Sequence, residues 1–244
     1  MADDSILWLE SCQSTNDEAA KYVSSRDYLT VAAGQQSKGR GRMGRTWHSP
    51  PGSGLYLSHI VFPRFSQKIC GVIPLLAGVA VAETCESLGV SVQLKWPNDI
   101  FIGSRKLAGI LCETQGQPSQ WNAIIGIGLN LKTPESGWPG DLPAIALDSI
   151  YEGELSKRWI ARHLVRRIEN RMIELELHGT EPLFDSWYER AFALDTPIRR
   201  GYLEGTFAGL TPRGALMIRT TGGTETIEAG DIAVSYTHLR AHET

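Results

Sequence analysis

Cysteine is scarce in this sequence, and the placement of the few cysteines argues against a structural zinc site. Four occur among 244 residues, at Cys12, Cys70, Cys85 and Cys112. None forms a C-x-x-C pair, and no cluster of histidine and cysteine has the spacing of zinc ligands. We therefore expect reduced, buried thiols, which are typical of a cytosolic protein.

Long hydrophobic runs are also lacking. The longest apolar stretch, near residues 73–81, is interrupted by Gly78 and is shorter than the roughly 20 residues that a membrane helix needs. The first ten residues carry Asp3, Asp4 and Glu10 without a positively charged segment, so they do not resemble a signal peptide. The sequence therefore predicts a cytoplasmic protein with no membrane partner.

Charge of neither sign is in strong excess, and the common catalytic motifs are missing. The net charge is −3, with 42% hydrophobic and 21% charged residues, as in ordinary soluble globular proteins. This balance does not indicate a DNA-binding protein. There is no P-loop, no Rossmann fingerprint and no Ser-His-Asp or Cys-His set. The scattered histidines are predicted to be structural: His48, His59, His163 and His178.

The hydrophobic pattern predicts an α+β fold with two parts. Strands are expected at 6–9, 29–33, 55–62, 90–96, 100–102, 107–113 and 123–131, and helices at 18–23, 73–88, 159–177 and 182–192. Ser14 is a candidate N-cap for the first helix. After Pro197, short strands at 198–203, 204–210, 215–220 and 224–229 alternate with glycine turns and indicate a small SH3-like β barrel. We expect a mixed-sheet catalytic domain over 1–195, the β module over 196–234, and a non-native or disordered tail over 235–244.

The strongest functional signal is a loop rich in glycine and arginine at residues 39–47 (GRGRMGRTW). Glycine lets a backbone approach an anion closely, and arginine offers planar donors matched to phosphate and carboxylate oxygens. Such a loop is expected to be flexible when empty and to become ordered around an anion. A solvated basic loop or a weak nucleic-acid contact is the alternative interpretation.

A second signal is the stretch 95–99 (KWPND). Lys95 ends an apolar strand and is followed by Trp-Pro, so we expect its ammonium to point into a cleft. There it could hold a carboxylate against the α-phosphate of ATP and stabilise charge in the transition state. Asn98 and Asp99 could orient ligands or a metal. A structural lysine paired with an acid is the alternative.

Three weaker motifs complete the set. Lys106 opens the strand 106–113 (KLAGILCE), which Gly109 interrupts, and the stretch 126–130 (GIGLN) leaves one strand face bare. A flat ligand or another backbone could lie on that face, although plain sheet packing would give the same pattern. The short polar residues 14–16 (STN) could bind a hydrogen-bonding head group as well as cap a helix.

These five motifs occur in the same order in the biotin protein ligases, and the sequence resembles that family from Ser14 to about Val234. The resemblance implies a catalytic domain related to class II aminoacyl-tRNA synthetases and lipoate ligases, followed by an SH3-like domain. It also implies two half-reactions. Biotin and ATP, with Mg²⁺, form biotinyl-5′-AMP and pyrophosphate, and a lysine of a biotin carboxyl carrier domain then displaces AMP. A homodimer is possible by the same resemblance.

The resemblance also assigns roles to individual residues. Lys95 and Arg42 would be catalytic. Biotin would be bound by Ser14, Thr15, Asn16, Gln36, Arg40, Gly41, Arg42, Lys95, Gly109 and Gly128. ATP or the adenylate would be bound by Arg40, Arg42, Arg45, Trp47, Asn98, Lys106 and Asn130. No residue is assigned as a metal ligand. No winged helix is expected before Ser14, so we expect neither repressor activity nor DNA binding.

Two rival functions remain at this point. A lipoate ligase or another acyl ligase could use the same scaffold, and stabilisation by biotin or by lipoate would separate the two. A nucleic-acid-binding module could use the basic loop, and its binding would fall steeply with salt. The net charge of −3 and the single short basic segment argue against the second rival.

Overall fold

The computed structural model describes residues 6–139, 143–192, 194, 196–228, 230 and 232–234. The predicted non-native tail, 235–244, lies outside these residues. Within them no helix is both long and apolar enough to cross a membrane.

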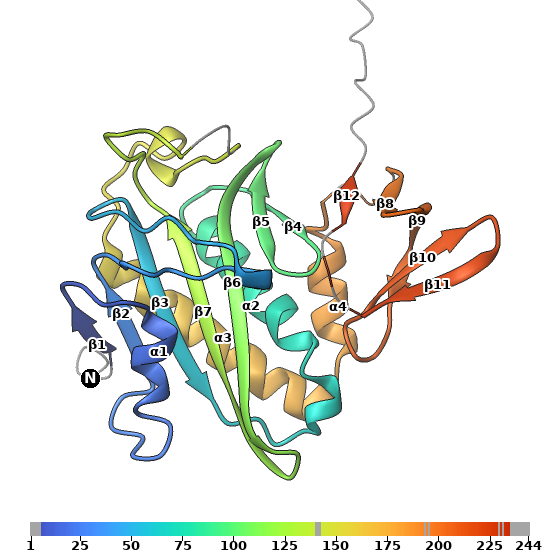
Figure 1. Ribbon diagram of the computed structural model, residues 1–244, viewed down its shortest axis with the longest axis horizontal. Helices are drawn as coiled ribbons and strands as arrows, with labels where there is room; N and C mark the ends of the chain where they lie inside the picture. Colours follow the sequence, from blue (N-terminus) through green and yellow to red (C-terminus); the bar gives the residue numbers. More distant parts are fainter. Residues whose placement is uncertain are drawn as a thin grey trace, which may run out of the picture.

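A seven-stranded mixed sheet forms the centre of the larger part of the molecule (Figure 1). Its strand order is β1-β2-β3-β7-β6-β5-β4. The strands are β1 (Ile6–Leu9), β2 (Thr30–Ala33), β3 (Gly54–Val61), β4 (Gln93–Lys95), β5 (Asp99–Ile102), β6 (Arg105–Gln117) and β7 (Gln120–Asn130). Strands β1 and β2 pair in parallel, and the other neighbours pair antiparallel. The predicted mixed sheet is thereby confirmed.

Three helices lie on one face of this sheet. They are α2 (Val72–Glu86), α3 (Lys157–His178) and α4 (Glu181–Tyr188), while the short α1 (Thr15–Ala20) lies on the opposite face (Figure 1). Short 3₁₀ helices occur at η1 (Arg42–Gly44), η2 (Gln67–Ile69) and η3 (Leu147–Ser149). Helix α2 is apolar all round because it is enclosed by the sheet, α3 and α4. Helix α3 needs only one apolar stripe, from Ile160 to Leu175, because its other side faces water.

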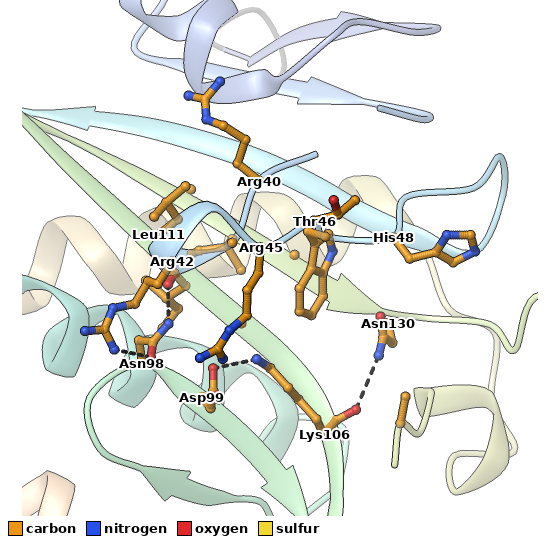
Figure 2. A pocket seen from close by; sticks show the side chains of 18 of the residues that line it. Arg40, Arg42, Arg45, Thr46, His48, Asn98, Asp99, Lys106, Leu111 and Asn130 are labelled. Atoms are coloured by element: carbon orange, nitrogen blue, oxygen red, sulfur yellow. Dashed lines mark hydrogen bonds and ion pairs between the residues drawn. The ribbon is translucent and has the colours of Figure 1, made fainter. Parts of the chain in front are cut away.

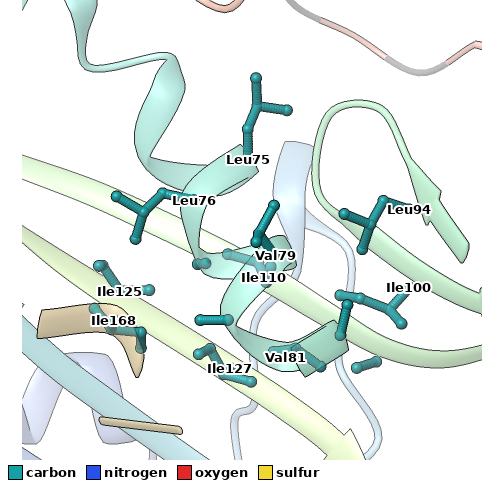
Figure 3. Close-up of a cluster of buried hydrophobic side chains, with 14 of the residues drawn as sticks. Leu75, Leu76, Val79, Val81, Leu94, Ile100, Ile110, Ile125, Ile127 and Ile168 are labelled. Atoms are coloured by element: carbon teal, nitrogen blue, oxygen red, sulfur yellow. The ribbon is translucent and has the colours of Figure 1, made fainter. Parts of the chain in front are cut away.

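Alternation along the strands divides the apolar side chains between the two faces. Ile125 and Ile127 of β7 join Leu76 and Val79 of α2 in the main core, which Figure 3 shows. On the other face of β7 the corresponding positions near its end are Gly126 and Gly128. The helix-covered face therefore carries the main core, and the other face, which packs a smaller cluster against α1, is left open at the glycines for a site.

The C-terminal residues form a separate antiparallel sheet of the order β11-β10-β9-β8-β12. Its strands are β8 (Ile198–Arg200), β9 (Leu203–Leu210), β10 (Leu216–Thr220), β11 (Gly223–Ile227) and β12 (Ala233–Val234). The predicted small all-β, SH3-like module is confirmed, although β11 and β12 stay at opposite ends of the row within the described residues. The Trp96 indole donates to the Gly214 carbonyl at 2.9 Å and ties the module to the larger part.

Most predicted elements are present, with shifted ends. The expected strand 90–96 shrinks to Gln93–Lys95, and β6 continues to Gln117 as a long hairpin with β7. Ser14 occupies the N-cap position of α1, but its side chain makes no capping hydrogen bond. Strand β12 was not predicted, because two residues carry no periodicity.

His59 of β3 is a buried histidine on the helix-covered face, and it makes stability depend on pH. Its Nδ1 lies 2.8 Å from Thr30 Oγ1, and its Nε2 lies 4.0 Å from a carboxylate oxygen of Glu169. Burial lowers the pKa of His59 from 6.5 to about 4. The unfolded chain therefore binds this proton more tightly, so the stabilising contribution is complete above pH 6.5 and is lost as the pH falls towards 4.

We expect this one group to lower the free energy of unfolding by about 2 kcal/mol between pH 7 and pH 5. Urea unfolding of the wild type and of His59→Gln at both pH values measures the difference. The variant lacks the titrating ring, so the wild type should lose more stability than the variant on acidification. Equal losses in the two proteins would contradict the assignment.

Candidate active site

A cavity of about 320 Å³ opens on the sheet face opposite α2 and α3. Strands β5, β6 and β7 contribute its floor, the residues just before and in α1 form one end, and the loop 39–48 covers it. The loop is held as a narrow turn by two backbone hydrogen bonds. Gly41 N–H donates to the Arg45 carbonyl at 2.7 Å, and Trp47 N–H donates to the Gly39 carbonyl at 2.9 Å.

Glycines make the floor flat enough to take an indole ring. A Cβ added at Gly128 would lie 2.2 Å from Nε1 of Trp47, and one added at Gly109 would lie 2.8 Å from the same ring. Gly109 and Gly128 are direct partners across β6 and β7, so together they form one bare patch. The Trp47 Nε1 lies against Gly128 and is buried without a hydrogen-bond partner among the described residues.

Short polar side chains line the end of the cavity near α1. The Thr15 backbone N–H and its hydroxyl both donate to Gln36 Oε1, at 2.8 and 3.1 Å. Ser58 Oγ lies 2.7 Å from Thr15 Oγ1. Ser14, Thr15 and Ser58 are all almost fully buried, so this end offers several fixed hydroxyl and amide groups in a dry environment.

Cations gather at the other end of the cavity, as Figure 2 shows. The Lys106 ammonium lies 2.6 Å from Asp99 Oδ1 and 5.3 Å from the centre of the Trp47 ring. Arg42 donates to Asn98 Oδ1 at 3.1 Å, and Asn98 donates in turn to the Ile110 carbonyl at 2.7 Å. Arg45 extends towards Asp99 and Lys106. Three positive groups thus surround a volume that contains one carboxylate, an arrangement suited to a polyanion.

Arg40 points the other way. Its guanidinium is turned towards α1 and away from Lys106 (Figure 2), where it lies 2.6 Å from Asp17 Oδ2 and 3.2 Å from both carboxylate oxygens of Glu113. The hydrogen bond from Arg40 holds the pKa of the Asp17 carboxyl below its usual value.

Comparison with known proteins shows the family to which this chain belongs. Residues 8–130 match the Biotin/lipoate A/B protein ligase family, and residues 198–235 match the Biotin protein ligase C terminal domain. The bifunctional ligase/repressor BirA of Bacillus subtilis is 34% identical over 232 residues, covering 92% of this chain and 71% of that protein. The chain belongs to the biotin protein ligases, within the biotin/lipoate A/B protein ligase family.

Two further biotin protein ligases match nearly end to end. The biotin–[acetyl-CoA-carboxylase] ligase of Paracoccus denitrificans is 30% identical over 240 residues, covering 92% of this chain and 98% of that protein. The solved biotin protein ligase from Aquifex aeolicus in complex with biotin and ATP is 26% identical, has a TM-score of 0.79, and covers 95% of this chain and 98% of its own. The fold expected from the resemblance is confirmed.

Most residues predicted for the ligase site line the one cavity. These are Ser14, Thr15, Gln36, Arg40, Gly41, Arg42, Arg45, Trp47, Asn98, Lys106, Gly109, Gly128 and Asn130. Their assembly from several separate segments was not visible in the sequence. The roles given to them stay predictions, since their placement alone does not measure ligand binding.

Two predicted site residues lie elsewhere. Lys95 is on β4, the edge strand, where its ammonium lies 5.4 Å from the centre of the Phe101 ring, and it is not among the residues that line the cavity. Asn16 is buried behind the cavity wall. It donates to Glu113 Oε2 at 2.6 Å, and its Oδ1 lies 2.6 Å from Ser58 Oγ. The sequence predicted that Lys95 points into the cleft and that Asn16 binds the ligand, whereas neither residue lines the cavity in the structure.

Some residues of the site were missed in the sequence. Ser58 lies in an apolar strand, and its polarity there was an available signal. Asp99 was seen as a ligand-orienting group but not as the partner of Lys106. His48 lines the cavity, although it was expected to be purely structural. Among the described residues, no group of three or more histidines, cysteines or acids could hold a metal ion.

Proposed function

We propose that this protein activates biotin with ATP and transfers it to a lysine of a biotin carboxyl carrier domain. The observation that carries the proposal is a cavity that combines a small-hydroxyl end, a bare glycine floor and a cationic end. The named relatives, a biotin–[acetyl-CoA-carboxylase] ligase and a ligase bound to biotin and ATP, support it.

Lys106 is the proposed catalytic cation in the first half-reaction. A biotin carboxylate oxygen attacks the α-phosphorus of ATP, and pyrophosphate leaves with the electron pair of the broken P–O bond. Negative charge then builds up on the oxygens of the α-phosphate. The ammonium of Lys106, which lies 2.6 Å from Asp99 Oδ1, would balance that charge, together with Arg45, which extends towards it.

The second half-reaction needs only access and a good leaving group. The amine of the acceptor lysine attacks the acyl carbonyl of the adenylate, AMP leaves, and the nitrogen loses a proton. The same cations that stabilise the α-phosphate also stabilise the departing AMP. The hydroxyl end, with Ser14, Thr15 and Gln36, would hold the ureido group of biotin in both steps.

Mg²⁺ is part of the proposal as a companion of ATP. This ion usually keeps several waters and binds through phosphate oxygens plus one or two carboxylates. Asp99 lines the cavity at the cationic end and could supply such a carboxylate, so the site fits the ion without a dedicated protein cage. Bound there, Mg²⁺ would neutralise part of the phosphate charge.

The partners and setting follow from several features. Strand β5 pairs with β6 only as far as Gly109, while β6 runs to Gln117, which leaves a strand edge that supports a proposed homodimer. The four cysteines are free thiols, as is usual for proteins of the cytoplasm, so we propose that the protein is cytoplasmic.

Arg42 and Arg45 face the cavity and Arg40 binds carboxylates, so we propose no DNA partner. We also propose 1–195 and 196–234 as the ligase and SH3-like domains.

The test is incubation with ATP, Mg²⁺, biotin and a carrier domain, followed by mass measurement of the carrier. One biotinyl group per carrier is expected, and none without ATP. Biotin, but not lipoate, should raise the melting temperature, because a ligand at 100 times its Kd stabilises a protein by about 2.7 kcal/mol. Modification by lipoate and not by biotin would establish the rival acyl ligase instead.

A further inference from the structure

The carboxylates of Asp17 and Glu113 hold the guanidinium of the loop arginine Arg40 away from the cationic end of the cavity. The two acids come from different elements, Asp17 from α1 and Glu113 from β6. Arg40 lies within 3.2 Å of both, so its side chain joins the glycine/arginine loop, residues 39–47, to two parts of the scaffold at once. A guanidinium pointing at phosphate was expected here, and the structure instead shows one that anchors the loop.

Glu113 is itself fixed by a chain of hydrogen bonds that reaches the hydroxyl end of the cavity. Its Oε2 accepts from Asn16 Nδ2 at 2.6 Å, and Asn16 Oδ1 lies 2.6 Å from Ser58 Oγ. Ser58 Oγ lies 2.7 Å from Thr15 Oγ1, which lines the cavity. Asn16, in the middle of this series of hydrogen bonds, is only 4% exposed, so the series is shielded from water and rigid there.

Gly126 makes room for this series of hydrogen bonds. A Cβ added at Gly126 would lie 2.3 Å from Asn16 Oδ1, so the amide of Asn16 rests directly on the strand backbone. Asn16 therefore has little freedom to move, and it presents the Glu113 carboxylate to Arg40 in one position. This arrangement explains why Asn16 is buried in the wall and does not line the cavity.

The loop has a second attachment on the opposite side. Arg42 donates to Asn98 Oδ1 at 3.1 Å, near the cationic end. The part of the loop that follows Arg42 is exposed over residues 43–46, and Met43 is 74% exposed with a left-handed φ of 55°. Exposed ion pairs are individually weak, so a loop held by Arg40 and Arg42 can open and close readily.

We propose that Asp17 and Glu113 are positioning residues that clamp Arg40 and thereby set how often the glycine/arginine loop opens. Asn16 couples the clamp to the hydroxyl end, so a ligand bound there favours the closed loop. This inference rests on the proposed function for the identity of the ligand. The clamp itself is a property of the empty protein and can be tested without any ligand.

The first measurement is trypsin cleavage after Arg42 and Arg45 in the empty protein. Asp17→Asn and Glu113→Gln should each increase the cleavage rate about five-fold, the factor that corresponds to about 1 kcal/mol. The double variant should show a larger increase. Glu18→Gln is the matched control, because Glu18 lies next to Asp17 on α1 but pairs with Lys21. It should cleave at the wild-type rate.

The second measurement is the dissociation rate of biotin. The same two variants should release biotin several-fold faster, while the association rate changes little. Unchanged loop cleavage in folded Asp17→Asn and Glu113→Gln would overturn the clamp, and so would an equal increase in Glu18→Gln. Asp17 is half-exposed, so Asp17→Asn is a safe variant if Glu113→Gln fails to fold. A protein that does not bind biotin but shows the expected cleavage would refute only the proposed function.

Discussion

Replacing Lys106 by alanine is expected to lower kcat/KM for adenylate formation by about 10³-fold while the protein stays folded. Removal of one preorganised group that stabilises transition-state charge costs about 10²–10³-fold, and here the group is a full positive charge in a sheltered cavity. The variant also leaves Asp99 without its partner at the cationic end, which adds repulsion towards phosphate. Pyrophosphate release from biotin and ATP measures the effect.

The matched control is Lys95→Ala. Each lysine is the first residue of a short sequence motif in the sheet, and of the two only Lys106 lines the cavity. Loss of Lys95 is expected to cost less than about 10-fold. A larger loss in Lys95→Ala than in Lys106→Ala would restore the assignment made from the sequence and contradict the one made from the structure.

The sequence did not show which of these two lysines faces the cavity, because a β-bulge changes the direction of the side chains between Lys106 and Gly109. Gly109 faces the cavity, so strict alternation would turn Lys106, three residues earlier, to the helix-covered face. The register shifts between β5 and β6: Ile100 pairs with Ala108, but Phe101 pairs with Lys106. Leu107 and Ala108 are therefore both fully buried in the main core, and Lys106 returns to the cavity face.

Local chemistry was easier to predict than long-range pairing. The glycine/arginine loop and the bare strand at 126–130 were recognised because glycine and arginine have few other reasons to occur in those patterns. The partners of Arg40 were not, because Asp17 and Glu113 lie 23 and 73 residues away in the chain. Only the folded sheet brings α1 beside β6, so an arginine expected on phosphate was found on carboxylates.

The floor of the cavity leads to the second large expected effect. Gly128→Ala should lower kcat/KM for ATP by about 100-fold, because its Cβ would lie 2.2 Å from Trp47 Nε1 and would push the ring into the space for the ligand. Overpacking of this kind also costs about 1–3 kcal/mol of stability. Steady-state kinetics with varied ATP and urea unfolding measure the two losses. Gly222→Ala is the control, since its Cβ would meet only Thr220 Oγ1, at 3.8 Å.

A double-mutant cycle with Trp47→Ala tests the cause of that loss. If the clash with the indole is responsible, the added methyl group fits into the space that the ring has left, and the double variant should be more stable than Gly128→Ala alone. The expected coupling is about 1–3 kcal/mol, well above the few tenths seen for independent sites. Additive losses would mean that the new methyl group disturbs the β6–β7 backbone instead. The flat glycine patch would then serve strand pairing, and the indole would not depend on it.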